Sequence, residues 1–161
     1  MTAELHNFSF FGLFLDVVVG LAGLAAILIF HGLSINSILV RFDLYADKAL
    51  LLKRYRSVFF WFYFSLILIA LIHVVEIFLW AVGLLALDLV PNLMMGLLFS
   101  GSCYTTVGFV DDLLPIGWKS LAFFISLSGL FSLAWTTSVM IHMTTSLKAA
   151  WQAQHRHTRP E

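Results

Sequence analysis

The sequence predicts an all-α membrane protein with three transmembrane helices and one shorter, re-entrant helix. Its 161 residues are 61% hydrophobic and only 11% charged, and the mean hydropathy is +0.96. Soluble domains rarely have such a composition, so we expect the chain to lie in a lipid bilayer. Three apolar runs each exceed the ~20 helical residues that cross ~30 Å of hydrocarbon. A fourth apolar run, between the second and third, is too short to cross.

The three long runs cover residues 8–32, 57–87 and 118–143. No Lys or Arg precedes the first run, and no small-residue cleavage pattern follows it. We therefore expect residues 1–32 to remain as an N-terminal transmembrane helix and not to be removed as a signal peptide. The second run is longer than the minimum and is expected to tilt or to project beyond the bilayer.

The short apolar run covers residues 91–104 and begins with Pro91. Proline suits the first turn of a helix because that position has no intrahelical N–H partner to lose. A helix too short to cross, placed between two spans, is expected to enter and leave the bilayer on the same side.

The basic residues predict how the chain is oriented. Five of the nine Lys and Arg lie in residues 33–56 and three in the short tail 144–161, and only Lys119 lies elsewhere. With three spans, these eight residues share one side. The positive-inside rule then places the N-terminus outside and both basic segments in the cytoplasm. We also expect a short interfacial helix over residues 44–57, leading into the second span.

Composition also argues against some classes of function. The formal net charge of zero argues against a nucleic-acid partner. The single Cys103 cannot form an internal disulfide and matches no metal or redox motif.

Polar residues interrupt the apolar sequence between the short run and the third span, in the segment YTTVGFVDD, residues 104–112. This segment resembles the selectivity filter of potassium-type channels, whose usual form is T-x-V-G-Y/F-G-D. The segments HVVEIFLWAV, FSGSCYTTVGF and GWKSLAFFISLSGLFSLAWTT are similar to small bacterial two-transmembrane ion channels with an extra N-terminal helix. The resemblance extends over residues 57–143.

The resemblance implies a pore module made of an outer helix (57–88), a pore helix (91–104), a filter (105–111) and an inner helix (117–143). It implies a homotetramer in a bacterial inner membrane that passes ions down their gradient and is not an enzyme. No cofactor is implied beyond the permeant K⁺ in the filter. The filter residues would be Thr105, Thr106, Val107, Gly108, Phe109 and Val110, with K⁺ held at Thr106, Val107, Gly108 and Phe109.

Physical arguments favour the same segment. Irregular backbone at membrane depth is tolerated only where it is buried or lines a water-filled path. A re-entrant helix that ends near Tyr104 would point its negative dipole end at the membrane centre, which stabilises a dehydrated cation. Asp111 and Asp112 would form an anionic ring at the outer mouth and raise the local cation concentration.

Val110 departs from the pattern, which has a second glycine at this position. That glycine serves a backbone geometry that a β-branched residue adopts at a cost of about 1–3 kcal/mol. Either the outer end of the filter has another shape and discriminates less among cations, or potassium selectivity depends on the inner sites alone. Transporters of the Trk and Ktr type are also similar in having a single Gly-Phe per filter segment, but their four segments are linked in one chain.

Three ionisable residues within the predicted spans are further candidates. His73 and Glu76 are three residues apart and share a helix face, and the resemblance favours a role in bracing the pore helix. Metal binding or proton relay by the pair stays open. Asp16, in the first span, is expected either to face a neighbouring helix near His73 or to lie at the outer boundary.

The third span offers candidates for gating and for an inner cavity. Gly129 lies where inner helices of the resembled family bend, so a hinge and close packing are both open. Ser132, Thr136 and Met140 follow about a turn apart and are expected to line an inner cavity. No span carries the spaced arginines of a voltage sensor, which leaves lipid, pH, the ions or a regulatory partner as gating signals.

Three other functions compete with a potassium channel. They are a weakly selective or divalent cation channel, a non-conducting membrane scaffold, and a metal or proton-relay protein using Asp16, His73 and Glu76. A channel requires four copies with Thr106 on the axis, whereas a scaffold would pack that segment away from water. A relay requires the three ionisable groups to cluster within one subunit.

Overall fold

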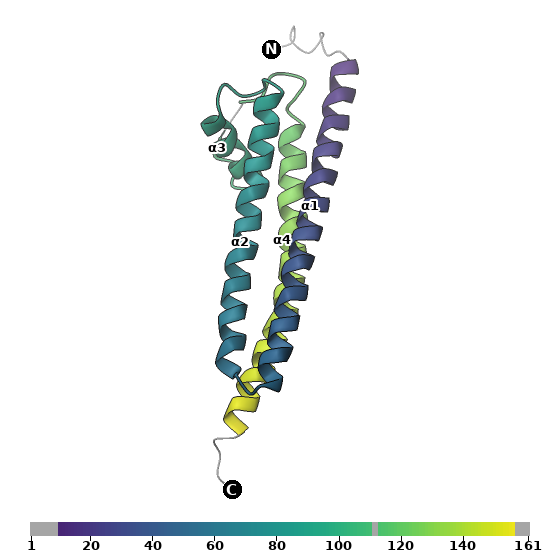
Figure 1. Ribbon diagram of the computed structural model, residues 1–161. Coiled ribbons are helices and arrows are strands. Elements are labelled where there is room, and N and C mark those ends of the chain that lie inside the picture. The colour runs from purple at the N-terminus through teal and green to yellow at the C-terminus, as the bar shows by residue number, and fades with distance from the viewer. Residues whose placement is uncertain (1–9, 111–112, 157–161) are drawn as a thin grey trace. The chain divides into compact units, whose positions relative to one another are not determined.

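The computed structural model describes residues 10–110 and 113–156, and this part of the chain contains helices and no strands. The helices are α1 (Phe10–Leu51), α2 (Tyr55–Ala86), α3 (Leu93–Tyr104) and α4 (Leu121–Arg156) (Figure 1). Helices α1, α2 and α4 are long and apolar enough to cross a membrane. The predicted all-α class and the three candidate spans are thereby confirmed, and they indicate a multi-pass membrane protein.

Helix α1 is longer than expected. It continues without a break to Leu51, so residues 33–56 are not a loop, and the interfacial helix expected over 44–57 is not a separate element. Buried side chains recur at helical spacing on one face of this stretch, which explains why the helix persists: Ile35, Phe42, Ala46 and Ala49. A turn then reverses the chain at Lys53, whose φ is 53°.

Helix α4 also extends past its predicted end at residue 143, as far as Arg156. Met143 and Ala150, seven residues apart, are both fully or almost fully buried, so the apolar face continues into the tail.

The chain divides into two compact units, and the long helices contribute to both. One, the α3 unit, comprises the chain up to Phe30 together with His73–Ser132. The other, the basic unit, comprises His31–Ile72 and the chain from Leu133 onward. Each unit has its own apolar core, which includes Trp80, Phe99, Tyr104 and Ile125 in the α3 unit and Phe42, Phe62, Val139 and Met143 in the basic unit.

Helix α3 begins at a side-chain cap. The Asn92 side chain accepts a hydrogen bond from the backbone N–H of Met95 at 2.9 Å, so Pro91 precedes the cap and does not occupy the first turn. Gly96 then brings α3 close to α2, because a Cβ there would lie 3.1 Å from the carbonyl oxygen of Ala81. In Figure 1, α3 lies beside α2.

Candidate functional site

The end of α3 has a defined stop signal. The N–H of Thr106 bonds to the carbonyl of Cys103 at 2.9 Å, and the N–H of Val107 bonds to that of Ser102 at 3.0 Å. This is the Schellman pattern, in which one residue takes a left-handed conformation. Thr106 is that residue, with a φ of 59°. Glycine usually occupies this position, so a β-branched residue stores backbone strain there.

Ser102 holds the segment that follows. Its carbonyl accepts hydrogen bonds from the N–H groups of Val107 (3.0 Å) and Gly108 (3.2 Å). Its hydroxyl accepts hydrogen bonds from the N–H groups of Phe109 (2.9 Å) and Val110 (3.3 Å). One buried serine therefore receives four successive backbone donors.

The direction of these donors fixes the direction of four carbonyls. None of the described peptide bonds is cis, and in a planar trans peptide the N–H of one residue points opposite to the C=O of the residue before it. The carbonyls of residues 106–109 must therefore point away from Ser102. These are the same four residues to which the family resemblance assigns the ion.

This row of carbonyls lies on an accessible strip of the chain. Residues 105–109 are all exposed, and Val107 and Phe109 expose 67% and 62% of their surface. Gly108 has a φ of 67° and no atom within 4 Å of where a Cβ would be. Thr105 instead uses its hydroxyl to bond the carbonyl of Gly101, at 2.6 Å. Nothing within the described part of the unit covers the segment.

Val110 lies outside the left-handed region, because positive φ values among the described non-glycine residues occur at Lys53, Asp88 and Thr106. Its side chain is partly buried and packs against the core of the α3 unit. The backbone strain expected at this position is therefore found at Thr106 instead. Asp111 and Asp112, the expected anionic ring, lie outside the described residues.

A buried polar cluster holds Tyr104, the last residue of α3. The Tyr104 phenol donates a hydrogen bond to Glu76 Oε2 at 2.5 Å, and His73 Nδ1 lies 2.7 Å from the same phenol oxygen. Because the phenol proton is directed at Glu76, Nδ1 must be the donor to Tyr104.

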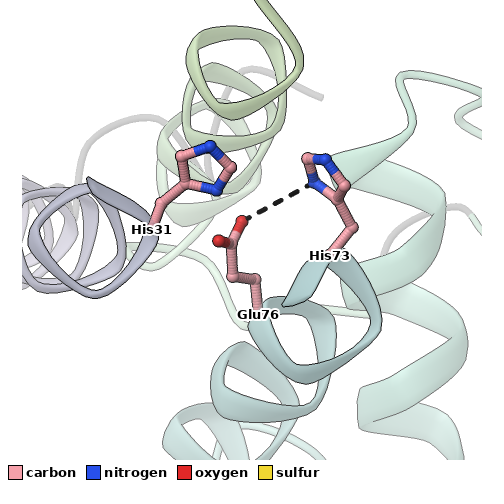
Figure 2. Close-up of side chains that lie close together, drawn as sticks. All are labelled: His31, His73 and Glu76. Atoms are coloured by element: carbon pink, nitrogen blue, oxygen red, sulfur yellow. Dashed lines mark ion pairs between the residues drawn. The ribbon is translucent and has the colours of Figure 1, made fainter. Parts of the chain in front are cut away.

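Figure 2 shows His73 and Glu76 projecting from α2, with an ion pair of 3.9 Å between Nδ1 and Oε2. Glu76 is fully buried, and a buried carboxylate needs such partners to offset the loss of water. His31, also labelled, comes from α1 in the basic unit, where its ring lies 5.9 Å from that of Trp135. The pair on α2 thus connects this helix to the residue from which the filter-like segment begins.

Gly129 on α4 packs directly against the end of α3. A Cβ at this position would overlap the carbonyl oxygen of Tyr104 and lie 2.9 Å from its carbonyl carbon. One turn earlier on α4, the Ser126 hydroxyl donates to the carbonyl of Cys103 at 2.9 Å. Close packing is therefore a sufficient reason for glycine here, in a helix that runs unbroken through this position.

Asp16 does not join His73 and Glu76 in a shared contact. Its Oδ2 accepts a hydrogen bond from the backbone N–H of Ser120 at 3.1 Å, immediately before α4 begins. Ser120 in turn provides the first carbonyl of that helix, to Phe123 and Phe124. A carboxylate at the positive end of a helix dipole is favourable. This offsets part of the cost of burying an acid that is only 1% exposed and whose Oδ1 has no hydrogen-bond partner among the described residues.

The residues expected to line an inner cavity separate into two groups. Ser132 and Thr136 are buried by the chain's own side chains, so they do not lie on a face open to a second copy. Met140 is partly exposed and borders a surface hollow of about 420 Å³ with Thr137 and Thr144. Ser132 and Thr136 thus lie one turn apart on the buried face of α4, whereas Met140 lies at the surface hollow.

Sequence reasoning missed Ser102, Ser126 and Tyr104 as positioning residues. All three lie within the segments that carried the resemblance. The sequence alone, however, does not show toward which neighbour a hydroxyl in an apolar helix points. For Ser102 and Tyr104 the available signal was their grouping in SGSCYTT, where the polar segment begins.

Comparison with known proteins adds no relative, since no family model, curated protein or solved structure matches the chain.

Proposed function

We propose that the protein is a passive, potassium-permeable cation channel in which four copies place residues 106–109 around a common axis. The observation that carries this proposal is the set of four successive carbonyls that point away from Ser102 on an exposed strip. Rings of backbone carbonyls replace the hydration shell of K⁺ in selectivity filters. One chain supplies one wall of such a ring, so several chains are required.

The apolar side chains of the same strip support assembly. Val107 and Phe109 are more than half exposed beside the carbonyls. Exposed apolar side chains that do not face lipid need cover from another chain. A neighbouring copy would provide that cover while leaving the carbonyls toward the axis.

The remaining parts fit this arrangement. The Tyr104–Glu76–His73 cluster and Gly129 fix the end of α3, so the carbonyls are held at one position. Thr137, Met140 and Thr144 replace Ser132 and Thr136 as candidates for the inner cavity wall. We place the protein in a bacterial inner membrane with the basic residues in the cytoplasm.

Rubidium uptake into liposomes containing the purified protein tests the proposal. We expect uptake above that of empty liposomes. Thr106→Ala should reduce it about tenfold or more, because the substitution removes a hydroxyl and changes the residue that carries the left-handed turn. Ser37→Ala is the matched control, since its exposed hydroxyl donates to the carbonyl of Leu33 within α1. Equal uptake by all three preparations and by empty liposomes would rule out conduction.

A weakly selective cation channel is the second candidate, and Val110 favours it. The residue packs inward and lacks the left-handed backbone that the usual glycine provides. Val110→Gly should therefore shift the reversal potential toward that of potassium in a sodium–potassium gradient. If the reversal potential stays where it is, Val110 does not limit selectivity.

A further inference from the structure

A second candidate binding site lies in the basic unit. A cavity of about 290 Å³ opens between α1 and α2. Its wall includes Arg41 and Tyr45 from α1 and Trp61 and Leu68 from α2. The rings of Tyr45 and Trp61 stack with centroids 3.9 Å apart and planes at 1°. This pair forms part of the cavity wall, and Leu68 lies two turns further along α2.

The position along α2 places this cavity at the edge of the bilayer. A span of ~20 residues counted back from Ala86 ends near residue 67. Residues 59–64, which end three positions nearer the start of α2, are six consecutive aromatic residues. Aromatic side chains gather at the membrane–water interface. Leu68 is therefore at hydrocarbon depth, and Trp61 is at the depth of the lipid headgroups.

Arg41 gives the cavity a positive charge at headgroup depth. Its side chain is exposed, and no carboxylate in residues 10–110 or 113–156 forms an ion pair with it. The nearest acid in sequence, Asp43, is engaged by His142 Nε2 at 3.1 Å and 3.3 Å. The guanidinium is therefore free to bind an anion, and its geometry suits the oxygens of a phosphate.

The surroundings add to this charge. Residues 33–56 contain two carboxylates, Asp43 and Asp47, and five cationic side chains, all exposed: Arg41, Lys48, Lys53, Arg54 and Arg56. A basic pocket between transmembrane helices, on the side where such residues gather, is suited to anionic lipid headgroups.

We infer that this cavity binds an anionic phospholipid, with the headgroup phosphate on Arg41 and one acyl chain along Leu68. Arg41 supplies a positive charge at headgroup depth, and Leu68 supplies an apolar wall at hydrocarbon depth. Together they favour a lipid over a free anion. The site links α1 and α2 through a lipid molecule and does not require that the protein conducts.

Trp61 provides a local reporter. We would reconstitute the full-length protein in vesicles and quench its fluorescence with brominated phosphatidylglycerol or brominated phosphatidylcholine. Each measurement is repeated in a Trp61→Phe background, and the difference is assigned to Trp61. We expect a clear preference for phosphatidylglycerol. Arg41→Gln should lower that preference about fivefold, the effect of one cation at a membrane surface, and Arg41→Lys should retain part of it.

Two control variants separate binding in this cavity from a general attraction of anionic lipid to the basic residues. Lys53→Gln removes the same charge from the same end without touching the cavity wall, so the preference should change less than twofold. Leu68→Phe should weaken quenching by both lipids while keeping the preference. Equal losses in Arg41→Gln and Lys53→Gln, or no preference in the parent protein, would overturn the inference. Displacement of the lipid by inorganic phosphate alone would also overturn it, since it would reveal a simple anion site.

Discussion

Replacing Gly129 with alanine is expected to abolish rubidium uptake and to lower the thermal stability of the assembled protein. The added methyl group would overlap the backbone carbonyl of Tyr104, and that carbonyl cannot rotate away as a side chain would. Overpacking of this kind costs about 1–3 kcal/mol and displaces backbone. The displaced segment is the end of α3, from which the four carbonyls are positioned.

Circular dichroism melting and size-exclusion chromatography measure this effect. We expect a lower melting temperature and loss of the homogeneous assembly. Gly83→Ala is the matched control, because Gly83 lies in α2 with no atom within 4 Å of an added Cβ. It should be neutral or stabilise by about 0.5–1 kcal/mol, as alanine favours helix. If Gly129→Ala melts at the same temperature as the parent but changes rubidium uptake, the glycine serves as a hinge and not as a packing site.

The helices were the most predictable part of the structure, and their ends the least. A run such as 57–87 has no charge to interrupt it over most of its length, so hydropathy alone identifies α2. The end of α1 could not be found in this way. Past residue 32 its buried apolar residues recur on one face while others, such as Leu33 and Leu44, are exposed. Such a pattern is compatible with both a long helix and a short interfacial one.

The filter-like segment was located from sequence, but its support was not. The change from apolar to polar residues after Tyr104 marks the segment. What holds it depends on contacts between residues far apart in sequence, such as Tyr104 with Glu76 and Gly129. The buried face of α4 likewise could not be predicted from the sequence, because serine and threonine occur on both its buried and its exposed sides.

Ser102 allows the sharpest test of the carbonyl arrangement, since its two oxygens hold different halves of the segment. Ser102→Ala removes the hydroxyl and leaves the backbone carbonyl. The N–H groups of Phe109 and Val110 would lose their acceptor, whereas those of Val107 and Gly108 would keep theirs. An orphaned donor of this kind costs about 1–3 kcal/mol. We therefore expect the outer half of the segment to lose its fixed conformation while the fold persists.

The expected result is a fall of about tenfold or more in rubidium uptake, with reduced discrimination between potassium and sodium and little change in melting temperature. Ser100→Ala is the control, two residues earlier on the same helix. Its hydroxyl is equally buried but has no hydrogen-bond partner among the described residues, so its removal should change neither quantity. If the two variants conduct alike, the orientation of the Phe109 carbonyl does not depend on Ser102. Nothing in the structure would then explain how the Phe109 carbonyls of several copies come to surround an ion.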